Sequence, residues 1–302
     1  MKQRHIALAV LIAAIWGFNF VVIKVGVAAV PPFMLLALRF FFAAVPAIFF
    51  IARPKVSITS LAGYGLMLAL GQFGFMFMAV KMGLPAGLTS LVLQLQAFFT
   101  MFFAWIVFAD MPKWFQIIGA VIAFAGIALI ATARWSGTDF LPLMLCVIAA
   151  AGWGASNIIA KAAKPQNALS FTVWSSLWSP LPLLAMSWIF EDHAQTATAL
   201  AHPTLIAIIA VVYLAALSTV FGYGAWNFLL TKYSAGTVAP FSLLVPIFGI
   251  LSGVLVLGES FDRFEIAGAL LVIAGLIFSN FGSAVLGLVL PKKMAEPEGS
   301  AK

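Results

Sequence analysis

Two short stretches of this chain carry the same chemical groups at the same spacing. WGFNFVVIK, residues 16–24, and WGASNIIAK, residues 153–161, each open with Trp-Gly and close with a lysine. An indole ring, side-chain amides and an ammonium group on about two turns of helix can border a cavity for a small polar molecule. Plain helix packing is the alternative role for the two tryptophans.

Other polar and aromatic residues are spread through further apolar runs. Arg39 lies more than one turn inside such a run. Its guanidinium can bind a carboxylate or hold backbone carbonyls and helix ends, and the sequence leaves both roles open. Lys24 either borders the cavity or reaches from a helix end to the surface. The candidate substrate-binding residues are Trp16, Asn19, Lys24, Arg39, Gln72, Gln94, Gln96, Trp153, Asn157, Tyr223 and Asn227.

The elements that position these residues are expected to be membrane-spanning helices. Hydrophobic residues make up 64% of the 302-residue chain and charged residues 8%, whereas a soluble domain has roughly 25% charged residues. About 20 helical residues cross a bilayer core of about 30 Å. The sequence predicts an all-α integral membrane protein with ten transmembrane helices, in residues 6–24, 33–52, 59–80, 84–108, 114–133, 140–160, 169–189, 204–229, 235–257 and 264–284.

Lysine and arginine are unevenly distributed over the predicted loops, and this bias sets the orientation. With the N-terminus inside, the cytoplasmic side holds Lys2, Arg4, Arg53, Lys55, Lys113, Lys161, Lys164, Lys232, Lys292, Lys293 and Lys302. The other side holds Lys24, Lys81, Arg134 and Arg263. We expect a multi-pass protein of the bacterial inner (plasma) membrane, with cytoplasmic termini and a disordered cytoplasmic tail at residues 291–302.

The chain also matches itself. An offset of 137 pairs Trp16 with Trp153 and Lys24 with Lys161. Further along, an offset of 149 matches PAGLTSLVLQLQAFF, Asp110 and GAVIAFAG with SAGTVAPFSLLVPIF, Glu259 and GALLVIAG, respectively. The sequence predicts two five-helix repeats, residues 1–137 and 138–290. Because five is odd, the second repeat enters the membrane from the opposite side, as in many secondary transporters.

These motifs resemble those of the drug/metabolite transporter superfamily, and specifically its EamA family. The resemblance rests on the WGxNF-type start, LRF at 38–40, PAGLTSLV and the paired G(x6)G motifs. GFNFVVIKVG, MLLALRF and SLVLQLQAFFT are similar to bacterial EamA exporters of cysteine-pathway metabolites such as O-acetylserine. The sequence departs from the family in ending one motif with FAD, where a Glu is usual, and in aligning Ser156 with Asn19. The resemblance implies a secondary-active exporter of small amino-acid-like metabolites, working by alternating access at a central cavity.

Several classes are disfavoured by what the sequence places elsewhere. All aspartates, glutamates and histidines fall in predicted loops, helix ends or the tail, so we expect no enzyme, metal or cofactor. The basic residues form no stripe that would follow nucleic acid. A non-transporting metabolite sensor or assembly partner remains an alternative, as does a transporter of this fold for an unrelated drug or metabolite. Oligomeric state and energy coupling stay open.

Two finer expectations concern single residues. Gln94 and Gln96 are about 200° apart on an ideal helix, so only one of them should face a cavity. Lys161 adds to the cytoplasmic charge, whereas Lys24 opposes that bias. We therefore expect Lys24 near the outer mouth of the cavity, where its ammonium attracts or releases a substrate carboxylate.

Overall fold

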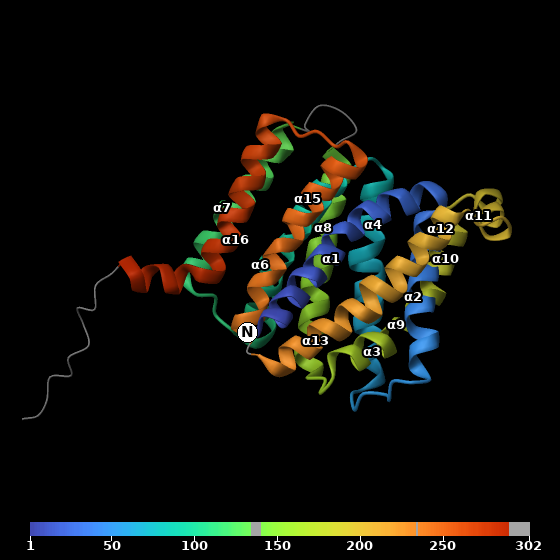
Figure 1. Cartoon of the computed structure of the whole chain (residues 1–302), viewed down its shortest axis with the longest axis horizontal. Coiled ribbons are helices and arrows are strands. Elements are labelled where there is room, and N and C mark those ends of the chain that lie inside the picture. Colours follow the sequence, from blue (N-terminus) through green and yellow to red (C-terminus); the bar gives the residue numbers. More distant parts are fainter. Residues whose placement is uncertain (134–139, 234, 290–302) are drawn as a thin grey trace, which may run out of the picture.

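The computed structural model describes residues 1–133, 140–233 and 235–289, and every regular element in these ranges is a helix (Figure 1). The prediction of an all-helical membrane protein is thus confirmed for the described chain. The predicted tail at residues 291–302 lies outside the described residues. Helices long and apolar enough to cross a membrane span Gln3–Ala29, Ile58–Lys81, Ala86–Phe108, Trp114–Ala133, Phe140–Ala163, Leu205–Lys232, Pro240–Leu257 and Arg263–Gly282.

The first half of the chain contains two long spans that are not uniform helices. In order, its elements are α1 (Gln3–Ala29), α2 (Pro32–Ile48), α3 (Ile58–Leu66), a π-helical stretch (Met67–Gly74), α4 (Phe75–Lys81), α5 (Ala86–Val92), a 3₁₀ turn (Leu93–Leu95), α6 (Gln96–Phe108) and α7 (Trp114–Ala133). The π-helical stretch interrupts the third span and the 3₁₀ turn interrupts the fourth. Each therefore changes the helical register in mid-span.

The second half shows the same irregularities in the same order. Its elements are α8 (Phe140–Ala163), α9 (Ala168–Ser176), α10 (Pro180–Phe190), α11 (His193–Ala201), α12 (Leu205–Val212), a π-helical stretch (Tyr213–Phe221), α13 (Gly222–Lys232), α14 (Ala235–Val238), a 3₁₀ stretch (Ala239–Leu243), α15 (Leu244–Leu257) and α16 (Arg263–Val289). As in the first half, one span contains a π-helical stretch and the next span contains a 3₁₀ segment.

Two predicted crossings are shorter than expected. Residues 33–52 yield α2, which ends at Ile48. Residues 169–189 are not continuous, because the chain breaks between α9 and α10 just before Pro180. Proline lacks a backbone N–H and is tolerated at the first position of a helix, where that N–H would have no partner within the helix, so α10 begins at Pro180. Both α2 and α10 are apolar but fall below the usual spanning length.

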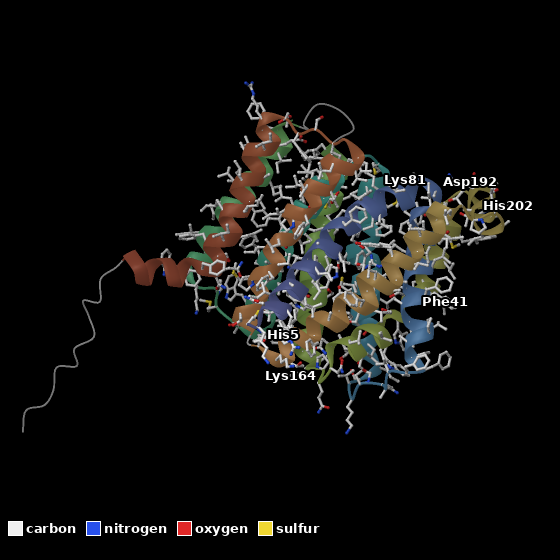
Figure 2. All side chains as sticks on the ribbon, viewed as in Figure 1. His5, Phe41, Lys81, Lys164, Asp192 and His202 are labelled. Carbon is white, nitrogen blue, oxygen red and sulfur yellow. The ribbon has the colours of Figure 1, made fainter. Side chains whose placement is uncertain are left out.

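The helices form a bundle with two recognisable ends. We call the end near His5 and Lys164 the N face and the end near Lys81, Asp192 and His202 the far face (Figure 2). At the far face, the Glu191 carboxylate accepts hydrogen bonds from the first amides of α2, those of Phe33 and Met34, over 2.6 and 3.2 Å. A carboxylate is stabilised there because the first amides of a helix lack internal acceptors.

Glycines set the closest helix contacts, and these contacts cross between the halves. A Cβ on Gly17 of α1 would lie 2.5 Å from Phe248 Cβ of α15, and one on Gly154 of α8 would lie 2.8 Å from Phe99 Cβ of α6. Residues larger than glycine therefore do not fit without displacing the partner helix. α7 and α16 pack antiparallel in the same manner, with Gly119 against Gly275 and Gly126 against Gly268.

Candidate functional site

A cavity of about 390 Å³ lies inside the bundle. It extends from Met76 and Ser90, near the far-face ends of their helices, to Asn157 and Trp226, near the N-face ends of theirs. The predicted candidates that border it are Trp16, Asn19, Arg39, Gln72, Gln94, Gln96, Trp153, Asn157 and Tyr223. The structure therefore gathers these side chains from both halves of the chain around one space.

All four irregular segments contribute to the cavity wall. Gln72 comes from the first π-helical stretch and Ser218 from the second, while Gln94 and Ser242 come from the two 3₁₀ segments. Backbone that departs from the α-helix is tolerated at membrane depth only where it is buried in protein or lines a cavity. The irregular segments are thus explained by their place beside the cavity.

Arg39 is almost completely buried at the cavity, with 3% of its surface exposed. Its guanidinium lies over the Phe73 ring, with Cζ 4.0 Å from the ring centroid, and Nη2 makes a long hydrogen bond of 3.4 Å to Thr219 Oγ1. Among the residues that the structure describes, Nε and Nη1 have no hydrogen-bond partner. A buried cation with unused donors is costly unless another group completes its bonding.

Unused acceptors border the same cavity. Asn19 Oδ1 and Gln72 Oε1 are buried, and neither has a hydrogen-bond donor within the described part of the chain. Gln72 directly precedes Phe73, the ring on which the Arg39 guanidinium rests. The cavity thus offers both donors and acceptors to a small molecule.

Aromatic rings form one wall of the cavity. Trp16 Nε1 donates a hydrogen bond of 3.0 Å to the carbonyl of Ser218, a residue of the second π-helical stretch. The Trp16 ring lies 5.5 Å from Tyr223 and 5.3 Å from Trp226 between centroids. Trp226 is not among the candidates predicted from the sequence, although its position three residues after Tyr223 places both on one helix face.

On the other side of the cavity, amide groups bond across helices. Asn157 Nδ2 donates to Gln96 Oε1 over 2.8 Å and to Thr100 Oγ1 over 3.0 Å, which ties α8 to α6. Gln94 and Gln96 both border the cavity, so the expectation that only one would face it is wrong. That expectation assumed ideal α-helical spacing, which the 3₁₀ turn Leu93–Leu95 interrupts.

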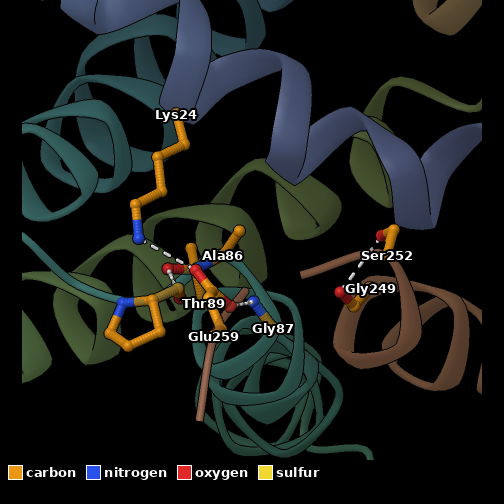
Figure 3. A network of polar contacts seen from close by, with 8 residues as sticks. Lys24, Ala86, Gly87, Thr89, Gly249, Ser252 and Glu259 are labelled. Carbon is orange, nitrogen blue, oxygen red and sulfur yellow. Dashed lines mark hydrogen bonds and ion pairs between the residues drawn. The ribbon is translucent and has the colours of Figure 1, made fainter. Parts of the chain in front are cut away.

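Two candidates lie outside the cavity wall. Asn227 is half-buried on α13 and makes a weak contact of 3.5 Å to Asn167. Lys24 Nζ lies 2.9 Å from Glu259 Oε1, and Glu259 also accepts from the backbone amides of Ala86 and Gly87 over 2.6 and 2.9 Å (Figure 3). The carboxylate that the structure places at Lys24 is therefore the chain's own Glu259.

The sequence-equivalent lysine makes an equivalent pair near the N face. Lys161 Nζ lies 2.7 Å from Asp110 Oδ2. Asp110 follows Ala109, and Glu259 follows Gly258. The preceding residues, Ala109 and Gly258, both lie in the left-handed region, with φ of 54° and 65°. The hydrogen bond and charge of Lys161 lower the pKa of Asp110, which lies beyond the end of α6. All four charged residues stand out in the sequence repeat, but neither pairing was predicted from it.

Membrane-spanning helices around a central cavity that is lined by several polar side chains are the architecture of a multi-pass membrane transport protein. The sequence profile of the EamA-like transporter family matches residues 3–132 and 140–281, which is most of the chain. The chain belongs to the EamA-like transporter family, as the sequence motifs predicted.

Relatives match over almost the whole chain. A protein of Salmonella typhimurium named "Probable amino-acid metabolite efflux pump" is 43% identical over 291 residues, which are 94% of this chain and 97% of that protein. A protein of the same name from Escherichia coli K12 is 39% identical, with 93% of this chain and 96% of that protein covered. A solved crystal structure at 17% identity superposes with a TM-score of 0.59 over 97% of this chain and 100% of that chain, which supports the fold.

Proposed function

We propose that this protein is a secondary-active exporter of small amino-acid-like metabolites, which opens its central cavity alternately to the two sides of the membrane. The observation that carries this proposal is the central cavity, where Arg39, Asn19 and Gln72 hold buried hydrogen-bonding groups that have no partner among the described residues. Its relatives named as amino-acid metabolite efflux pumps support the direction and the class of substrate.

The proposal includes ten crossings arranged as two inverted repeats, residues 1–137 and 138–290. α2 and the broken α9–α10 segment supply the two shorter crossings. Support comes from the matching order of irregular segments in the two halves. It also comes from the left-handed residues Ala109 and Gly258, which are 149 positions apart, the offset of the sequence repeat.

Crossed packing gives further support for the repeats. Gly17 and Gly154 are 137 positions apart, and the residues that they contact, Phe248 and Phe99, are 149 positions apart. Each repeat's first helix thus packs on the other repeat's fourth helix at the equivalent place. This exchange is the pattern expected of two copies related by a two-fold axis.

The proposed orientation places the N face in the cytoplasm of a bacterium and the far face outside the inner membrane. The loop charges support this orientation through the positive-inside rule. A reporter that is active only in the cytoplasm should work when fused after residue 302 and fail when inserted at residues 191–203. The reverse pattern would contradict the proposed topology.

Purified protein in liposomes tests the proposed function. A panel of labelled amino acids and simple derivatives is loaded inside or outside, and movement across the bilayer is measured against empty liposomes. We expect transport of at least one, weakened by Asn157→Leu in the cavity wall and little changed by Asn227→Leu outside it. Binding without movement would identify a sensor, and movement only of unrelated drugs would give a transporter with another substrate.

A further inference from the structure

The unused polar atoms of the cavity form a set with two kinds of chemistry. Arg39 supplies a fixed positive charge and donors at Nε and Nη1, while Asn19 and Gln72 supply acceptors at Oδ1 and Oε1, and none of these atoms has a partner in the part of the chain that the structure describes. The three residues are 3%, 6% and 3% exposed, and all border the cavity. Among the described residues that border it, Arg39 is the one with a full charge.

This set matches the head group of an α-amino acid. A carboxylate is a negatively charged hydrogen-bond acceptor and suits a guanidinium, whereas a protonated amine is a hydrogen-bond donor and suits amide oxygens. The nearby rings of Trp16 and Tyr223 can also face a cation. An uncharged or purely cationic molecule would leave the Arg39 charge unbalanced in a buried place.

We propose that Arg39 binds the substrate carboxylate and that Asn19 Oδ1 and Gln72 Oε1 accept from its ammonium group. This inference rests on the proposed function and narrows its substrate class to molecules with a free carboxylate and a free amine. The rest of the cavity, including Trp153 and Trp226, surrounds the side chain of the substrate.

Binding to the purified protein tests this site without requiring transport. The twenty amino acids are screened by the change in tryptophan fluorescence, since Trp16, Trp153 and Trp226 border the cavity. The tightest binder is then compared with its methyl ester and its N-acetyl form. We expect each blocked form to bind roughly 10-fold or more weakly, because each loses a charged hydrogen-bonding group. Equal binding of the blocked forms, or binding of no amino acid, overturns the proposal.

Variants check the assignment of each group. Arg39→Gln should weaken binding of the free amino acid and remove the difference in affinity between the acid and its methyl ester. Arg53→Gln, at an exposed position, should change neither the affinity nor this difference. The double variant Asn19→Leu, Gln72→Leu should remove the difference between the free and the acetylated amine. If the binding results are as expected but the protein moves no amino acid across the liposome membrane, the exporter function is refuted and the assignment of the binding site is kept.

A second inference comes from the ion pairs, which are independent of the cavity's unused atoms. Lys24 lies four residues after Phe20, and Lys161 lies four residues after Asn157; Phe20 and Asn157 both border the cavity. Each lysine is therefore about one helical turn beyond the cavity, at opposite ends of the bundle. Each pairs with the acid that ends the fourth helix of the other half, Glu259 for Lys24 and Asp110 for Lys161.

The two pairs are not in the same state. The Glu259 side chain is 5% exposed and also holds the first amides of α5, those of Ala86 and Gly87 (Figure 3). Ser90, one turn along α5, already borders the cavity. The Asp110 side chain is 63% exposed. Beyond one end of the cavity, a carboxylate is thus docked on a helix, and beyond the other end the equivalent acid is largely exposed.

We infer that the covered Lys24–Glu259 pair is the latch of a gate at the far face, and that the exposed Lys161–Asp110 pair is not an equivalent latch in this state. The far-face latch is closed in this structure. When access alternates, Glu259 leaves the start of α5. This inference rests on alternating access in the proposed function.

Labelling of a cavity cysteine tests the latch without measuring transport. Cys146 is replaced by alanine, Ser90→Cys is introduced, and a membrane-impermeant maleimide is added at the far face. We expect Glu259→Gln and Lys24→Met to raise the labelling rate roughly 5-fold or more, because each removes charged hydrogen bonds that close this end. Lys161→Met should not raise it. An unchanged rate in Glu259→Gln, or an equal rise in Lys161→Met, overturns the inference.

A charge exchange separates a latch from a simple ion pair. The double variant Lys24→Glu, Glu259→Lys keeps an ion pair but places an ammonium against two amide donors, so we expect labelling of the cysteine introduced by Ser90→Cys to stay fast. The matched exchange Lys161→Glu, Asp110→Lys should leave the labelling rate at the far face unchanged. Slow labelling in the first exchange would show that the amide contacts are dispensable and would contradict the docked carboxylate.

Discussion

Lys24 and Glu259 are 235 residues apart in the chain, yet their side chains form a pair in which Glu259 is 5% and Lys24 31% exposed. Lys161 and Asp110, the sequence-equivalent pair, are 48% and 63% exposed. Removing one member of a covered pair leaves the other charge without its counter-charge, whereas an exposed pair contributes little. We therefore expect Lys24→Ala to reduce export roughly 10-fold or more and Lys161→Ala much less.

This comparison is made in cells or liposomes with equal amounts of the two variants in the membrane. Lys24→Arg serves as the control, because it keeps the positive charge beside Glu259. Equal and small losses in both alanine variants would show that the shared lysines are surface anchors inherited from duplication.

Asp110 should not be the proton-sensing group of the transporter. The neighbouring Lys161 lowers the pKa of Asp110 below the ordinary value of 3.8. The Asp110 carboxylate is therefore ionised at every pH above 3.8, and it is protonated only when the pH falls through the lowered pKa. Between about pH 5 and 8 Asp110 stays charged. We expect Asp110→Asn and the unaltered protein to show the same shape of export against pH in this range. A flattened profile in Asp110→Asn would contradict this assignment.

At the C-caps of α6 and α15, exchanging alanine for glycine and glycine for alanine should change the stability of the protein in opposite directions. Ala109 and Gly258 both adopt a positive φ, which costs an alanine more than a glycine. Ala109→Gly should stabilise the protein by roughly 0.5–1 kcal/mol, and Gly258→Ala should destabilise it by roughly 1–2 kcal/mol. Thermal unfolding in detergent measures both, and a stabilising Gly258→Ala would show that the cap geometry is not needed.

The crossed glycine contacts should be intolerant of one added methyl group. A Cβ on Gly17 would lie 2.5 Å from Phe248 Cβ and 2.8 Å from the Gly249 nitrogen. Gly17→Ala should therefore destabilise the protein by roughly 1–3 kcal/mol. Gly63→Ala is the matched control, because its nearest neighbour would be 3.8 Å away and alanine favours the helix. Equal unfolding temperatures for the two variants would argue against tight packing of α1 on α15.

The sequence predicted the features that depend on local composition and failed where two distant segments meet. Apolar runs located the spans. Nine of the eleven candidates border one cavity, because polar side chains in apolar membrane helices usually face a cavity or a polar partner. The pairing of Lys24 with Glu259 was missed because repeat offsets align equivalent residues but do not tell which helix packs on which. The π-helical stretches were missed because hydrophobic periodicity is too coarse to show one shifted hydrogen bond.

The glycines between α7 and α16 have a consequence for how such a chain is put together. Gly119 of one half meets Gly275 of the other, and Gly126 meets Gly268; the repeat equates Gly119 with Gly268 and Gly126 with Gly275. The same surface therefore meets itself turned around, as in an isologous dimer. Two half-length chains made separately could restore this contact only if the ribosome and insertion machinery delivered them to the bilayer in opposite orientations.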